Sequence, residues 1–146
     1  MVTIDGDASE WLSDWRLDST LTGVLGYGIF GTSDESNFYF AIASDEPLLG
    51  TGEASNTAIG LSTTIWLDTD LDRATGYQIW GFVGGVEYNI EVMPNGDVQL
   101  FSGGPGETLL ATLTSAYNTD QTFLEFSVPK SLLAGDPERV RIFADV

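Results

Sequence analysis

The chain has 146 residues, 42% of them hydrophobic, which is enough apolar material for one ordinary folded domain. Its 22 acidic and five basic side chains give a net charge of −17, which repels nucleic acid and anionic membrane surfaces and attracts cations. Cysteine and histidine are absent, which excludes disulfides, thiolate or imidazole metal sites and Ser–His or Cys nucleophile systems. Oxygen ligands remain, and these suit calcium or magnesium.

Short runs rich in β-branched and aromatic residues recur along the chain, separated by turn residues. They predict strands over residues 2–4, 26–31, 37–44, 61–67, 78–83, 87–92, 98–102, 110–114, 123–128 and 139–146. The Asn95-Gly96 pair between two alternating runs predicts a hairpin. Single helical turns are expected at residues 7–11 and 129–135. We therefore expect an all-β, antiparallel β-sandwich with one or two short helical turns, in a single domain covering residues 1–146.

Three carboxylates alternate directly after the strand expected at 61–67, at Asp68, Asp70 and Asp72. In a loop, this spacing can turn several oxygens toward one centre, and calcium binds about 6–8 oxygens. The loop is not an EF-hand, because Arg73 stands where the sixth position requires glycine and Ile79 where the twelfth requires glutamate. A calcium site here must therefore take further ligands from elsewhere; the alternative is a solvated acidic turn.

Side-chain alternation indicates where a further ligand could come from. It places Trp66 and Asp68 on the outward face of one strand, and Asn89 and Glu91 on the outward face of another. If these strands are neighbours, Glu91 could complete the shell around the Asp68 loop.

A second candidate calcium site lies at Asp5 and Asp7, which flank Gly6. Its alternative is an ordinary Asp–Gly turn.

The same outward face could also bind a ligand. An aromatic ring can stack on the C–H face of a sugar while amides and carboxylates bind its hydroxyls. The candidate residues are Trp66, Trp80, Asn89, Gln99 and Phe101. The alternative is that the tryptophans pack under a loop or the second sheet. Trp11 is expected in the core.

Three blocks of sequence together span nearly the whole chain. They are Ile4-Asp5-Gly6-Asp7 with Glu10-Trp11; Ile65-Trp66-Leu67-Asp68-Thr69-Asp70 with Thr75-Gly76-Tyr77 and Glu87-Tyr88-Asn89-Ile90-Glu91; and Phe126-Ser127-Val128-Pro129 with Leu132-Leu133. This pattern resembles the family 9-like carbohydrate-binding modules, a DOMON-like group of β-sandwiches of jelly-roll type. The resemblance implies structural calcium, with ligands at Asp68, Asp70 and Glu91, and sugar binding by aromatic side chains.

We therefore expect a non-catalytic, calcium-binding carbohydrate-binding module, monomeric within a larger multidomain protein that is secreted or lies on a bacterial-type cell surface. The alternative is a calcium-stabilised structural or adhesive spacer domain, which differs in having no exposed tryptophan platform. An enzyme is not expected: without histidine or cysteine, catalysis would rest on a carboxylate pair, and 22 acidic residues produce such pairs by chance. Membrane insertion is not expected either, because no apolar run is long enough to span a bilayer.

Overall fold

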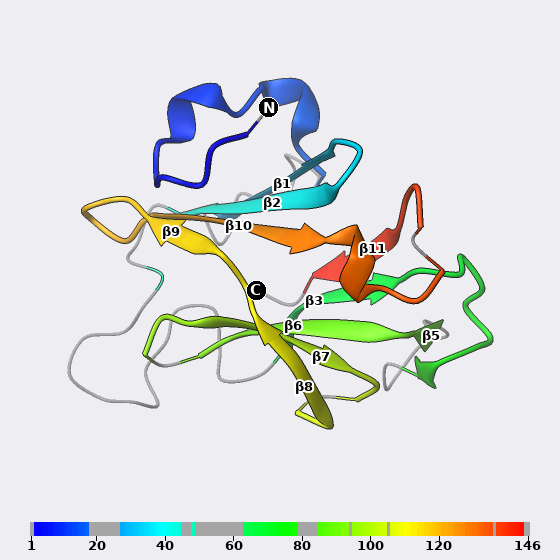
Figure 1. Cartoon of the computed structure of the whole chain (residues 1–146). Helices are drawn as coiled ribbons and strands as arrows, with labels where there is room; N and C mark the ends of the chain where they lie inside the picture. The colour runs from blue at the N-terminus through cyan, green and yellow to red at the C-terminus, as the bar shows by residue number, and fades with distance from the viewer. Residues whose placement is uncertain are drawn as a thin grey trace.

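The structure is a computed structural model that describes residues 2–17, 27–44, 48, 63–78, 85–93, 95–104, 106–135 and 137–144. Two antiparallel sheets lie face to face (Figure 1). Sheet A has the strand order β1 (Tyr27–Ser33), β2 (Asn37–Ser44), β10 (Phe123–Pro129) and β9 (Ser115–Tyr117). Sheet B has the order β11 (Arg141–Ala144), β3 (Thr63–Asp68), β6 (Tyr88–Val92), β7 (Val98–Ser102) and β8 (Thr108–Thr112). The predicted all-β antiparallel sandwich is confirmed.

Smaller elements complete the fold. A two-stranded ribbon pairs β4 (Tyr77–Gln78) with β5 (Gly85–Val86). The described residues include three single 3-10 turns: η1 (Ala8–Glu10), η2 (Ser13–Trp15) and η4 (Lys130–Leu132). The first and the last of these fall at the two positions where the sequence predicts helical turns. No helix in the described ranges is long and apolar enough to cross a membrane.

The main core lies between the sheets and follows the alternation of the strands. Buried side chains there include Phe38, Phe40 and Ile42 of β2 and Ile65 and Leu67 of β3. Strand β6 contributes every second residue, and so does β10. Each fully buried side chain of this size contributes roughly 1.5–3 kcal/mol to stability. The side-chain alternation predicted from the sequence for β3 and β6 is confirmed, since the residues between the predicted outward ones lie in this core.

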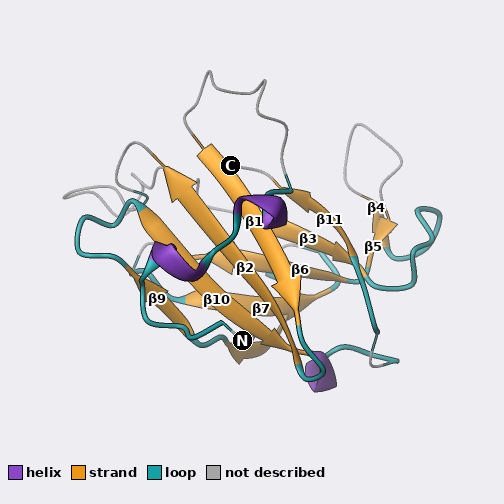
Figure 2. Ribbon diagram, turned by 90° about the horizontal axis from the view of Figure 1, so that it is seen from above, coloured by secondary structure: helices purple, strands orange, loops and turns teal. Residues whose placement is uncertain are grey.

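A second apolar cluster lies on the other face of sheet A, where the N-terminal segment crosses β1 and β2 (Figure 2). Trp11 is buried there, as expected, with its ring edge-on to Trp15, Phe30 and Phe123. The segment 2–4, predicted as a strand, forms no ladder. Val2 packs into this cluster instead, so the segment covers sheet A as an extra layer rather than extending it.

The hairpin predicted at Asn95-Gly96 is confirmed, since β6 pairs with β7 and Val92 lies opposite Val98. Gly96 has φ +96°, a left-handed conformation that favours glycine. The observed bounds of β2 and β7 equal those predicted, whereas β9 was not predicted at all. The strand expected over 78–83 begins as β4, and residues 79–84 lie outside the described part of the chain.

Candidate metal centre

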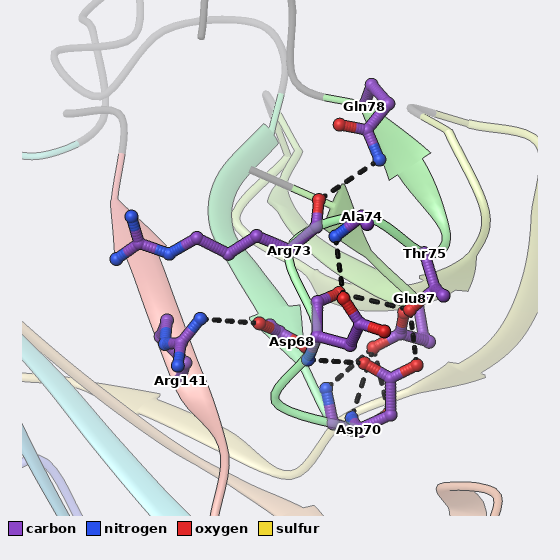
Figure 3. Close-up of polar contacts among 10 residues, drawn as sticks. Asp68, Asp70, Arg73, Ala74, Thr75, Gln78, Glu87 and Arg141 are labelled. Carbon is purple, nitrogen blue, oxygen red and sulfur yellow. Dashed lines mark hydrogen bonds and ion pairs between the residues drawn. The ribbon is translucent and has the colours of Figure 1, made fainter. Parts of the chain in front are cut away.

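The centre forms where β3 ends and its loop begins (Figure 3). Asp68 is the last residue of β3 and its side chain is 0% exposed. Strand β11 pairs with β3 so that Arg141 lies opposite Asp68, and the Arg141 guanidinium donates to Asp68 Oδ2 at 3.3 Å. The buried Asp68 carboxylate thus lies beside a cation from the neighbouring strand.

Glu87 approaches the same point from the other neighbour of β3. Tyr88 pairs with Leu67, and the Glu87 backbone N–H donates to the Leu67 carbonyl, so Glu87 lies beside the end of β3. Its Oε1 accepts from the Thr69 backbone N–H at 2.7 Å and from the Thr69 hydroxyl at 3.2 Å. The Glu87 carboxylate therefore also fixes the first residues of the loop.

The alternating aspartates build the loop itself. Asp70 Oδ1 accepts from the Asp72 N–H at 2.9 Å, and Asp72 Oδ1 accepts from the Ala74 N–H at 2.9 Å. Each bond closes a turn between a side chain and the backbone two residues further on, a conformation that Asp and Asn favour. The Thr75 hydroxyl donates to Asp70 Oδ2 and ties the far end of the loop back to its start.

Three carboxylates converge at the centre. One oxygen from each of Asp68, Asp70 and Glu87 lies within 4.8 Å of the others. Asp68 Oδ1 and Glu87 Oε2 are buried and have no hydrogen-bond partner among the described residues. Buried polar atoms are normally satisfied, so an acceptor without a partner on each of two converging carboxylates fits an oxygen-coordinated cation.

The pKa shifts are consistent with a crowded centre. Burial, followed by the proximity of Asp70 and Glu87, raises the pKa of Asp68, while Arg141 lowers it in part. The Thr75 hydroxyl, which donates to Asp70, lowers the pKa of Asp70. Without a cation, Asp68 is therefore the carboxyl that retains a proton more readily than its neighbour, and metal binding has to displace that proton.

The structure brings only part of the predicted metal set together. Asp68 and Asp70 meet, whereas the exposed Asp72 lies outside the three-carboxylate group and shapes the loop. Glu91 lies opposite Thr63, at the other end of β3, and its Oε2 accepts from the Gly106 N–H at 3.0 Å. Burial raises the pKa of Glu91.

Sequence reasoning missed Glu87, although a signal was present. Glu87 and Glu91 share the same face by alternation, so parity does not separate them. Antiparallel pairing does, because it places the end of one strand beside the start of its neighbour. The residue facing Asp68 must therefore come from the start of β6, not from four residues further along.

The second predicted metal site is arranged differently. Asp5 lies with Glu10 and Glu125 in a group of carboxylates, whereas Asp7 lies outside that group. Asp7 Oδ1 accepts from the Ser9 N–H at 2.8 Å, which caps η1 and lowers the pKa of Asp7. Asp7 thus has a local structural role.

Both carboxylate oxygens of Glu125, in that second group, accept hydrogen bonds from the protein. Its side chain is buried, and Oε1 accepts from the backbone N–H groups of Asp5 at 2.6 Å and Gly6 at 2.7 Å. Its Oε2 accepts from Trp11 Nε1 at 2.6 Å. Glu125 is therefore the anchor that holds the N-terminal segment on sheet A.

The predicted ligand face is assembled but covered. Trp66, Asn89 and Phe101 lie in one row across β3, β6 and β7, as the alternation predicts. Their side chains are only 5%, 0% and 8% exposed. Gln99 is half-buried, and Trp80 lies outside the described residues.

Two local structures account for that burial. The Trp66 ring stacks on Tyr77 of the β4–β5 ribbon, with centroids 5.5 Å apart and planes 6° from parallel. Asn89 Nδ2 donates to the carbonyls of Gly103 and Gly104 at 2.9 and 3.0 Å, which holds the following loop over the sheet. The face of the Trp66 ring is therefore covered by Tyr77, and the Asn89 amide nitrogen is bound to backbone carbonyls.

Comparison of the chain with protein-family models, with curated proteins and with solved structures finds no match.

Proposed function

We propose that this chain is a non-catalytic β-sandwich module whose fold is stabilised by one calcium ion bound to Asp68, Asp70 and Glu87, and that it works as a structural or adhesive domain outside the cytoplasm. The observation that supports this most is the pair of orphaned buried oxygens, Asp68 Oδ1 and Glu87 Oε2, within a group of three carboxylates. A bound cation would satisfy both at once.

The charge balance supports a divalent ion. When ionised, the three carboxylates carry three negative charges and Arg141 returns one positive charge. The three carboxylates have oxygens within 4.8 Å of one another, so their ionised forms repel one another. A doubly charged cation neutralises the remainder and converts this repulsion into attraction.

The form of the site favours calcium over magnesium. Magnesium requires a nearly ideal octahedron and retains several waters, whereas calcium accepts irregular sets of about 6–8 oxygens. Asp70 lies on an exposed loop, so water can supply the oxygens that the three side chains do not. Extracellular modules commonly bind calcium with dissociation constants of about 0.1–1 mM, which fits a compartment rich in calcium.

A structural or adhesive role is favoured because the best aromatic candidate is engaged internally, Trp66 against Tyr77. Carbohydrate binding is the second candidate. In its favour, Tyr77 is only half-buried, and the exposed Gln78 beside it is held in place by its amide nitrogen, which donates to the Arg73 carbonyl at 3.2 Å.

Calorimetric titration of metal-free protein with calcium and, separately, magnesium tests the metal proposal. We expect one calcium per chain and at least tenfold weaker magnesium binding; no heat with either ion in folded protein would refute it. A glycan and polysaccharide screen of the calcium-loaded protein then separates the two candidates. Binding to a defined glycan that Tyr77→Ala abolishes would favour the sugar module, and absence of binding would favour the structural role.

A further inference from the structure

The two long sides of the sandwich differ. On one side β8 continues through Leu113 and Thr114 into β9, so a single stretch of chain joins the edges of the two sheets. On the other side the edge strands are β1 and β11, and a cavity of about 180 Å³ opens between them. Among the described residues, the sandwich is thus open at this cavity on the β1–β11 side.

The floor of this cleft is apolar. Phe38 and Phe40 of β2 reach it from the core, and Ile142 of β11 closes it from sheet B. At the β1 wall Gly31 has no side chain, and the half-exposed Leu17 packs against it, since a Cβ placed on Gly31 would lie 2.7 Å from Leu17 Cδ1. Its volume is similar to that of an apolar cavity of about 150 Å³ that holds a benzene ring, so one branched or aromatic side chain would fill it.

The rim carries one charge of each sign. Glu138 and Arg139 both line the cleft and both are exposed. Neither takes part in a salt bridge within the described parts of the chain. Thr32 and Ser33 of β1 add hydroxyl groups to the lining.

The charges of Glu138 and Arg139 indicate what charge a ligand of this cleft should carry. A monoanion would match Arg139 but is repelled by the overall charge of −17. A monocation would match Glu138 but meets carboxylates over much of this acidic protein and leaves Arg139 unpaired. A zwitterion has no net charge, and its two ends match both residues.

We propose that this cleft binds a free α-amino acid with an apolar side chain of about the size of leucine. The side chain lies on Phe38, Phe40 and Ile142, the carboxylate pairs with Arg139 and the ammonium pairs with Glu138. Charge-assisted hydrogen bonds to both ends supply the specificity. The site is separate from the metal centre and does not depend on the function proposed above.

Saturation-transfer NMR and calorimetry with L-leucine, up to about 10 mM, test the proposal in a range that detects millimolar dissociation constants. We expect binding, and equal affinity in calcium and in chelator. Three analogues, each lacking one feature, should bind at least tenfold more weakly: 4-methylpentanoate has no ammonium, 3-methylbutylamine no carboxylate and glycine no side chain.

Matched variants locate the site. Arg139→Gln and Glu138→Gln should each weaken leucine binding at least tenfold, whereas Arg73→Gln and Glu35→Gln, which change exposed residues outside the cleft lining, should not. Thermal melts establish that every variant is folded. The proposal is overturned by absent leucine binding to folded protein, by unchanged affinity in Arg139→Gln, or by 4-methylpentanoate binding as tightly as leucine.

Discussion

Replacing Glu87 with glutamine should remove most of the stabilisation by calcium, and the same change at Glu91 should not. Both substitutions keep the shape of the side chain and remove one negative charge. Glu87 contributes an oxygen to the three-carboxylate group, whereas Glu91 accepts a hydrogen bond from Gly106 at the other end of β3. The pair therefore separates loss of a metal ligand from general loss of acidic charge.

The size of the effect follows from linkage. Calcium at a hundred times its dissociation constant stabilises the native state by about 2.7 kcal/mol. For a domain of this size, 1 kcal/mol corresponds to about 3 °C, so calcium should raise the melting temperature by about 8 °C. If Glu87→Gln weakens calcium a hundredfold, the gain at the same concentration falls to about 0.4 kcal/mol, or about 1 °C.

In the metal-free state, Glu87→Gln should not lower the melting temperature. Glutamine at position 87 still offers an acceptor to the Thr69 backbone and relieves the repulsion by Asp68 and Asp70. Metal-free Glu87→Gln should therefore melt at the same temperature as the parent protein, or a few degrees higher. A carboxylate that binds a metal repels the neighbouring carboxylates when the ion is absent and so destabilises the metal-free protein. A carboxylate that only accepts a structural hydrogen bond would not have this effect.

The assay is differential scanning fluorimetry of both variants and the parent protein, in chelator and across a calcium series. Equal calcium responses in Glu87→Gln and Glu91→Gln would place the ion elsewhere. A parent protein that melts identically in calcium and chelator would refute the metal centre itself.

Three further measurements probe the surrounding contacts. Tyr77→Ala should lower the free energy of unfolding by about 2 kcal/mol and shift Trp66 emission to longer wavelength, because the indole loses its stacked cover; an unshifted spectrum would contradict that packing. Glu125→Gln should cost about 3 kcal/mol, because an amide cannot accept from all three donors at a buried carboxylate, and should speed amide exchange in the N-terminal segment; unchanged exchange around Trp11 would refute the anchoring role. Burial raises the pKa of Tyr117 to about 12, above the value of 10.0 for an exposed tyrosine, so the stability that depends on its neutral hydroxyl is complete below pH 10 and is lost as pH rises toward 12. Tyr117→Phe should reduce the alkaline loss of stability in melts taken between about pH 9 and 12, and identical pH profiles would count against it.

Much of the fold follows from local pattern. Alternation identifies the buried face of β2 through Phe38, Phe40 and Ile42, and a left-handed glycine after asparagine identifies the β6–β7 hairpin. Both signals involve only a few consecutive residues, so they can be recognised without knowing which strands pair with each other. The N-terminal segment does not follow its pattern, because Glu125, far away in the chain, binds its backbone.

The candidate site divides in the same way. The alternating aspartates determine a loop of side-chain turns, and the lack of cysteine and histidine restricts any metal ligands to oxygen. Which glutamate joins Asp68 is decided by the register of β3 against β6, and alternation alone leaves Glu87 and Glu91 equivalent.

The strand faces, the acidic loop and the class of ligand atom can thus be predicted from local sequence, because these depend on side-chain chemistry and on repeats of two residues. The approach of Glu87 to Asp68, the stacking of Tyr77 on Trp66 and the cavity between the described edge strands β1 and β11 become visible only in the folded chain. Those outcomes depend on strand register and on how layers cover one another. Both arise from contacts between residues far apart in the chain, which no local pattern encodes.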